Sequence, residues 1–142
     1  MGSSLKKLRQ DARRIFEAGL QAVDPVAAIN HYVKVNDGVL RIGERQFMLK
    51  DYDRILIVGA GKAVAPMAKA MEDHLGSRIA DGIIVTKDDH GLPLKKIKVR
   101  EAGHPVPDAR GVAGTEEILA LIEKATERDL VICLISGGGS AL

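Results

Sequence analysis

Short aliphatic runs separated by amphipathic segments dominate the chain after its first third, and they restrict the fold most strongly. Three such runs are residues 54–59 (RILIVG), 82–86 (GIIVT) and 130–136 (LVICLIS). Their interiors contain no charged residue, which is typical of strands covered on both faces. Residues 62–75 and 111–126 have the apolar spacing of helices. Strands of this kind alternating with helices predict a doubly wound α/β fold with a mainly parallel sheet.

The first third of the chain has a different pattern. Apolar residues recur at helical spacing over about residues 4–20, and Asp24 before Pro25 predicts the start of a second helix. The segment that follows contains turn signals and predicts a small antiparallel hairpin near residues 39–48, which we expect to be peripheral. We therefore divide the chain into helices and a hairpin in residues 1–50 and a parallel α/β core in residues 51–142.

The composition is that of a soluble globular domain. Of 142 residues, 46% are apolar, 28% are charged and 3% are aromatic, which predicts an aliphatic core. Because 21 Lys and Arg residues face 19 Asp and Glu residues, the net charge gives no reason to expect a nucleic-acid partner. No apolar run reaches the roughly 18 residues of a membrane span, and the amino end lacks an apolar signal core. We expect no membrane partner and a cytoplasmic location.

The single cysteine and the histidines do not indicate reactive or metal-binding chemistry. Cys133 lies inside the apolar run 130–136, where we expect a buried, small apolar side chain rather than a nucleophile. The histidines have no ligand spacing with each other or with Cys133, so we expect no metal held by this chain.

Loops that follow the predicted strands are expected to carry the function. In an open parallel sheet, ligands bind outside the carboxyl ends of the strands. The loops leaving Gly59, Thr86, Glu101 and Ile135 are therefore expected to share one rim of the sheet.

The first of these loops, GAGKA, suits an anion. Gly59 and Gly61 lack the Cβ atom that would keep a phosphate away from the start of the helix, so Gly59, Ala60 and Gly61 are candidates for binding it through the backbone. Lys62 adds a positive charge. The alternative is an ordinary strand-to-helix corner with a solvated lysine.

Two well-known nucleotide loops do not fit this stretch. A Walker A loop would need glycine in place of Leu56 and Ser or Thr in place of Ala63. A dinucleotide fingerprint would need its third glycine in place of Val64. Asp88 follows the next strand and could serve as the acidic residue that binds a ribose, so a nicotinamide site stays open as an alternative.

The last loop offers a run of unhindered amides. Ser136, Gly137, Gly138, Gly139 and Ser140 have the composition of a phosphate cradle. Loops of this kind also occur in proteins that only hold a phosphosugar, so a noncatalytic phosphosugar-binding module is a second alternative. The other reading is a flexible tail.

The loop after Glu101 contains one histidine and two prolines. His104 lies between Gly103 and Pro105, and the two prolines Pro105 and Pro107 stiffen the loop. A side chain positioned in this way is a candidate for substrate binding, although single histidines often serve as local hydrogen-bonding groups.

Four motifs occur in a fixed order: VGAGKAVAPMAKA, GIIVTKDDHG, EAGHPVPDARG and CLISGGGSAL. Together they resemble the glycerate kinase family, whose members make 2-phosphoglycerate from D-glycerate and ATP. Related sequences often carry a provisional label as hydroxypyruvate reductases, which would make NAD(P)-dependent reduction the enzymatic alternative. The resemblance runs from about Leu5 to the last residue.

The resemblance implies a two-domain enzyme in which a Rossmann-like amino-terminal domain faces a carboxy-terminal domain across the active-site cleft. It implies a catalytic role for Lys62, glycerate as the substrate and ATP and Mg²⁺ as cofactors, the metal arriving with the nucleotide. The glycine-rich turn at the end of the chain follows a predicted buried strand that a further helix would have to cover. We therefore expect the 142 residues to be the amino-terminal part of a longer protein, without its carboxy-terminal domain.

Phosphoryl transfer depends mainly on positioning and on neutralising the charge of phosphate oxygens, so amide-rich loops and a lysine are suitable parts. The resemblance also implies acidic and arginine site residues beyond Leu142, so we expect the chain alone to be inactive as a kinase. The general base, the preferred nucleotide and the oligomeric state are left open by the sequence.

Overall fold

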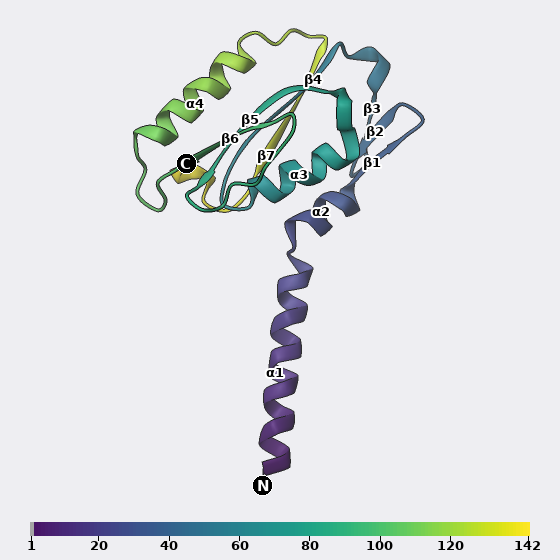
Figure 1. Ribbon diagram of the computed structural model, residues 1–142. Helices are drawn as coiled ribbons and strands as arrows, with labels where there is room; N and C mark the ends of the chain where they lie inside the picture. Colours follow the sequence, from purple (N-terminus) through teal and green to yellow (C-terminus); the bar gives the residue numbers. More distant parts are fainter. Residues whose placement is uncertain (1) are drawn as a thin grey trace.

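The computed structural model describes residues 2–142 and contains two β-sheets (Figure 1). The larger sheet has the strand order β6-β5-β4-β7, and its strands are all parallel. These strands are β4 (Arg54–Ala60), β5 (Ile79–Lys87), β6 (Lys98–Ala102) and β7 (Asp129–Ile135). The prediction of an α/β fold with a mainly parallel sheet is confirmed.

Helices α3 (Val64–Leu75) and α4 (Ala109–Ile122) lie on opposite faces of this sheet (Figure 1). Ile84 of β5 belongs to the core that includes the buried side of α3. The next residue, Val85, lies under α4, because a methyl group built on Gly114 would come within 2.8 Å of its Cγ2 atom. Successive side chains of a strand point to opposite faces, so the three-layer arrangement is confirmed.

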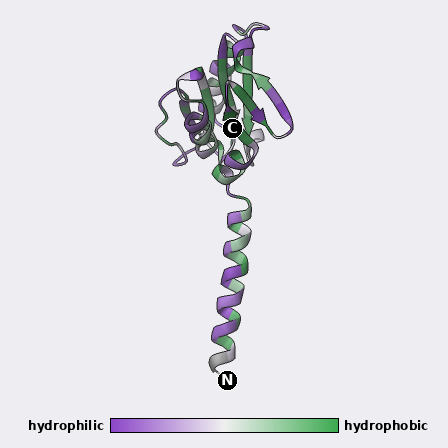
Figure 2. Cartoon of the chain, turned by 90° about the vertical axis from the view of Figure 1, so that its right-hand side faces the viewer, coloured by the Kyte–Doolittle hydropathy of each residue, from purple (hydrophilic) through white to green (hydrophobic). Residues whose placement is uncertain are grey.

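The chain begins with α1 (Gly2–Ala22), followed by α2 (Pro25–Tyr32). The helix expected over about residues 4–20 is confirmed, and it extends away from the rest of the domain (Figure 1). Figure 2 shows apolar and polar residues interleaved along it. Several of its large apolar side chains are well exposed, with Ile15 at 74%. Within residues 2–142, the helices lack the combination of length and apolar character that crossing a membrane requires.

The second sheet differs from the predicted hairpin by one strand. It contains β1 (Val33–Asn36), β2 (Val39–Ile42) and β3 (Arg45–Met48), paired antiparallel in that order. The hairpin near residues 39–48 corresponds to β2 and β3, and β1 is the addition. Asp37 and Gly38 both have positive φ angles, 50° and 77°, as a tight two-residue turn between β1 and β2 requires.

This second sheet is not peripheral, contrary to our expectation. Val33 and Leu40 are 3% and 0% exposed, and both belong to the same buried core as α3. The short strands present one apolar face to the helix, so they extend the core beyond the parallel sheet. A short helical turn, η1 (Leu49–Asp51), leads from β3 to β4. The proposed division at residue 50 stays a prediction.

Cys133 is exposed, and the prediction that it is buried was wrong. β7 is an edge strand whose side chains alternate between a covered face and an open one. Leu134 is 4% exposed against the α3 side, whereas Ile135 on the other face is 71% exposed. Helix α4 packs mainly on β5 and β6, which leaves an apolar groove beside Cys133.

An ion pair joins the first residues of β4 and β7. Arg54 donates from Nε and Nη2 to the Asp129 carboxylate at 2.9 and 2.7 Å. The Asp129 carboxylate, which is 1% exposed, also accepts from the amide and hydroxyl of Thr126 at 2.7 and 3.1 Å. The Arg54 guanidinium and then the Thr126 amide hold the pKa of Asp129 well below its usual range.

We predict that Asp129 contributes to acid sensitivity. Its pKa is lower in the folded than in the unfolded state, so its stabilising contribution is complete above the unfolded value of about 4. That contribution is lost as the pH falls below this value. Asp129→Asn should therefore lower the thermal unfolding temperature at pH 7 and reduce the further loss on acidification, as measured by circular dichroism. The loss should not vanish, because Asp53 and Glu117 also have lowered pKa values through Arg128 and Arg100. If the unfolding temperatures of parent and variant fell equally with decreasing pH, the prediction would be contradicted.

Candidate functional site

Two glycine-rich loops meet at the carboxyl ends of adjacent strands. The first follows β4 and the second follows β7, and these strands pair in parallel with Ala60 opposite Ile135. Since both strands end at this pair, the loops begin side by side. The predicted shared rim is confirmed for these two loops.

Hydrogen bonds lock the two loops together. The Lys62 amide donates to the Gly137 carbonyl at 2.9 Å, and the Ala63 amide donates to the Ser136 hydroxyl at 2.9 Å. In the other direction, the Ser136 amide donates to the Ala60 carbonyl at 3.1 Å. The second loop therefore caps the entry to α3, and the Ser136 hydroxyl serves this contact.

Gly61 has no room for a side chain at this junction. Its φ angle is 132°, and a methyl group built on it would lie 2.2 Å from the Ser136 hydroxyl oxygen. Its amide donates to the Val85 carbonyl at 3.1 Å, and its carbonyl accepts from the buried Thr86 hydroxyl at 3.1 Å. Gly61 is thus held by two hydrogen bonds to β5, while Ser136 of the second loop leaves no space on its Cβ side. Thr86 was not identified as a site residue, because a single threonine at a strand end gives no local signal for this contact.

These contacts leave few free amides in the first loop. The amides of Gly61, Lys62 and Ala63 all donate within the domain. An anion at this loop would therefore meet the Lys62 side chain rather than these amides. The binding roles of Gly59, Ala60 and Gly61 stay predictions.

The second loop keeps free amides. Within residues 2–142, the amides of Gly137 and Gly138 donate to no acceptor, whereas the Gly139 amide donates to the Ser136 carbonyl at 3.2 Å. Two neighbouring unpaired amides before a helical turn can bind an anionic oxygen. The phosphate cradle is best supported at Gly137 and Gly138, with the exposed Ser140 beside them.

Lys62 and His104 both lie against Gly138. A methyl group built on Gly138 would come within 2.7 Å of Nε2 of His104 and 3.2 Å of Cγ of Lys62. Neither the Lys62 ammonium nor the His104 ring makes a hydrogen bond or ion pair in the part of the chain that the structure describes. Three predicted site residues from three loops are therefore brought together, with two polar side chains available to a ligand. This juxtaposition confirms the shared rim for the third loop.

The loop that carries His104 is anchored by Asp108 and Arg110, which we did not single out from the sequence. Asp108 accepts from the Gly103 amide at 3.1 Å and caps the start of α4, and Arg110 pairs with Asp108 and with Asp88. The Arg110 guanidinium lowers the pKa of both carboxyl groups. An Asp directly before a helix is an N-cap signal that could have identified Asp108. The pairing of Arg110 with Asp88 depends on the fold and has no such signal.

Residues 2–142 contain no group of three or more His, Cys, Asp or Glu side chains placed to hold a metal ion. A divalent cation at this rim would therefore need other ligands, such as the oxygens of a bound nucleotide.

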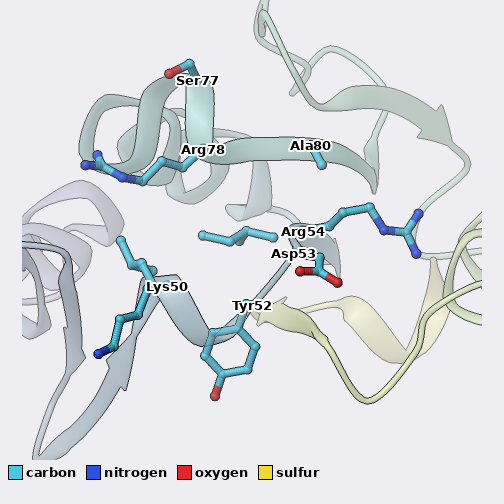
Figure 3. Close-up of a pocket in the computed structure, with 9 residues that line it drawn as sticks. Lys50, Tyr52, Asp53, Arg54, Ser77, Arg78 and Ala80 are labelled. Atoms are coloured by element: carbon cyan, nitrogen blue, oxygen red, sulfur yellow. The ribbon is translucent and has the colours of Figure 1, made fainter.

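A second groove lies at the other end of the sheet (Figure 3). Lys50 lines it from η1, Asp53 and Arg54 line it from the entry to β4, and Ser77 and Arg78 line it from the turn before β5. In a parallel sheet this is the amino-terminal edge, away from the edge at which ligands bind. Its Arg54 is engaged with Asp129, so we assign no part of the candidate site to this groove.

We predict that Gly138→Ala disturbs the site and Gly137→Ala does not. Alanine at 138 would adopt a φ of 90° and would collide with His104 and Lys62. The left-handed backbone alone should lower the free energy of unfolding by roughly 1–2 kcal/mol. A methyl group at Gly137 meets no atom within 4 Å, which makes this variant the matched control. Chemical denaturation measures both, and NMR shifts of His104 report the displacement. Equal stability and unchanged His104 signals in both variants would refute the collision.

Comparison with known proteins places the chain in a family. The family described as a domain of unknown function (DUF4147) matches residues 11–142. The Glycerate 2-kinase of Pyrococcus horikoshii is 41% identical over 135 residues, covering 95% of this chain and 30% of the relative. The D-glycerate 2-kinase of Thermotoga maritima is 38% identical over 141 residues, covering 98% and 30%. A protein of Agrobacterium vitis with the provisional name hydroxypyruvate reductase is 38% identical, covering 94% and 27%.

Solved structures agree with these relatives. A crystal structure of a Pyrococcus horikoshii protein matches with a TM-score of 0.83 and 41% identity, over 95% of this chain and 30% of that one. The crystal structure of the Thermotoga maritima glycerate kinase matches with a TM-score of 0.75 and 34% identity, over 96% and 30%. The chain therefore belongs to the DUF4147 domain family and is a homologue of glycerate kinases, of whose length it spans about 30%.

Proposed function

We propose that this chain is part of a longer enzyme that transfers a phosphoryl group from ATP to D-glycerate and forms 2-phosphoglycerate. The observation that supports this most is the meeting of Lys62, His104 and Gly138 at the carboxyl edge of the sheet, beside two unpaired amides. The names of the glycerate kinase relatives supply the substrate class. We also propose that a second domain of the same protein completes the cleft and that the enzyme is cytoplasmic.

The free backbone amides and the lysine at this rim are suited to bind the phosphate groups of a nucleotide. The amides of Gly137 and Gly138 would donate to phosphate oxygens, and the Lys62 ammonium would balance their negative charge. His104, in contact with the same glycine, would donate to the nucleotide or to glycerate. When bound with ATP, Mg²⁺ supplies further neutralisation of the phosphate oxygens. We propose no residue of this chain as the general base.

Two other functions are compatible with parts of the site. The provisional name of the Agrobacterium vitis relative favours an NAD(P)-dependent hydroxypyruvate reductase. Against it, the ribose-binding candidate Asp88 is already paired with Arg110 at 2.6 and 2.8 Å, and Val64 fills the third glycine position of the fingerprint. A noncatalytic phosphosugar-binding module would use the same two free amides without turnover.

Titrations separate these functions. In NMR experiments on this chain, we expect Mg²⁺-ATP to shift the amide signals of Gly137 and Gly138, while NADH shifts neither. In the longer enzyme, glycerate and Mg²⁺-ATP should yield ADP and phosphoglycerate. Oxidation of NADH or NADPH by hydroxypyruvate would favour the reductase, and phosphosugar binding without turnover would favour the module.

The Lys62 side chain gives the sharpest test of catalysis. If its ammonium contacts the transferring phosphoryl group, Lys62→Ala in the longer enzyme should lower kcat on the order of 100- to 1,000-fold, with a smaller effect on binding. Lys62→Arg should rescue poorly, because a planar guanidinium does not replace a compact ammonium in a tight loop. Lys69→Ala is the matched control, since Lys69 lies on α3 and pairs with Asp73. A folded Lys62→Ala enzyme within about threefold of the parent would exclude the role, because that is under 1 kcal/mol of barrier.

We also predict that purified residues 1–142 show no glycerate kinase turnover. The relatives that act as glycerate kinases are more than three times as long as their match to this chain, and the proposed cleft needs the additional domain. A coupled ADP-release assay measures turnover, with the longer enzyme as the positive control. Glycerate-dependent ADP release by the chain alone would show that the cleft does not need a second domain.

A further inference from the structure

Arg110 joins two loops of the candidate site. Its Nη1 and Nη2 atoms donate to the two oxygens of Asp88 at 2.6 and 2.8 Å. Its Nε atom donates to the Asp108 carboxylate at 2.8 Å. Asp88 directly follows β5, whereas Asp108 precedes α4, so one guanidinium connects the exit of a central strand to the start of a helix.

The same carboxylate holds the loop that carries His104. Asp108 accepts from the Gly103 amide at 3.1 Å and from the Arg110 and Gly111 amides at 2.9 and 3.2 Å. The His104 loop is therefore closed on itself at Asp108, and Arg110 fixes this closed loop to β5. The end of β5 also holds the first glycine loop, through the Thr86 hydroxyl. Both loops thus take their position from one strand.

The first turn of a helix is an unfavourable position for an arginine. Arg110 is the second residue of α4, where the helix dipole favours negative side chains. Two carboxylates around one guanidinium leave the group with a net negative charge, so it is unsuited to bind a phosphate or a carboxylate substrate. Arg110 is thus unfavourable for the helix dipole, and its ion pairs do not suit an anionic ligand. We infer from this that the ion pairs fix the positions of other residues.

We propose that Arg110 is a positioning residue that, with Asp88 and Asp108, keeps the His104 ring against Gly138 at the phosphate-binding rim. This role rests on the proposed function, but the contact that it maintains exists without any ligand. Without Arg110, the two carboxylates lose their shared cation and repel each other across the loop. The loop then moves away from β5 and takes His104 with it.

Two variants that change the charge in opposite directions test this positioning role. Arg110→Met removes a positive charge, and Asp88→Asn removes a negative one. If the group acted only through its electric field, the two variants would have opposite effects on an anionic ligand. If it acts by positioning, both should weaken the nuclear Overhauser contact between the His104 ring and the Gly138 α-protons in the 142-residue chain.

Arg100→Met is the matched control. Arg100 also makes an exposed bidentate pair, with Glu117 at 2.8 and 2.9 Å, and that pair also joins β6 to α4. It has no link to the His104 loop through these contacts. The control should therefore keep the His104 contact, while thermal unfolding shows that all three variants are folded. Asp88→Asn remains decisive if Arg110→Met fails to fold.

In the longer enzyme, Arg110→Met and Asp88→Asn should each lower kcat by about tenfold, with little change in KM for ATP, because His104 is misplaced. Arg100→Met should leave kcat unchanged. A retained His104 contact in both folded variants would overturn the positioning role. Absence of kinase activity in the parent enzyme would refute the proposed function, while the NMR contact would still test the role of Arg110.

Discussion

The interlock between the two glycine loops is the contact on which the candidate site depends. Because β4 and β7 are neighbours in a parallel sheet, their loops leave the same edge, and three short hydrogen bonds join them. Gly61 allows this approach because any side chain would occupy the position of the Ser136 hydroxyl. Once the loops are joined, Gly138 is held beside Lys62. The arrangement of the rim therefore follows from strand order and from one missing side chain.

The hydrogen bonds between the loops also decide which groups each loop leaves free for a ligand. The amides after β4 are used for internal hydrogen bonds, whereas the amides of Gly137 and Gly138 stay unpaired within the described residues. The first loop then contributes a cation, Lys62, and the second contributes the backbone donors. A similar division applies to the His104 loop, whose own polar groups are used to anchor it while its histidine is left available. Each loop exposes the group that its internal contacts do not use.

Several apolar surfaces of the chain have no cover in the described residues. Ile15 and Phe16 on α1 are more than half exposed, and so is Ile135 on β7 beside the groove that includes Cys133. Residues of this kind are usually buried when a surface is part of a larger core. Cys133 was expected to be buried because its run is apolar, but β7 is an edge strand and α4 packs mainly on β5 and β6. An apolar run predicts a strand, but whether both faces are covered depends on what packs beside it.

The sequence by itself determined the α/β class, the parallel strands and the three rim loops with their lysine, histidine and glycines, because strand periodicity and loop composition are local properties. It indicated strand-like stretches and a turn at Asn36–Gly38, but that β1 adds a third strand to the hairpin was decided by its pairing with β2. The tertiary structure decided which amides remain free, that Thr86 and Ser136 act as internal anchors, and that Arg110 joins Asp88 to Asp108. These features are contacts between segments distant in sequence, and the hydrogen-bond partner of a backbone amide is set by strand order and register, which no local pattern encodes.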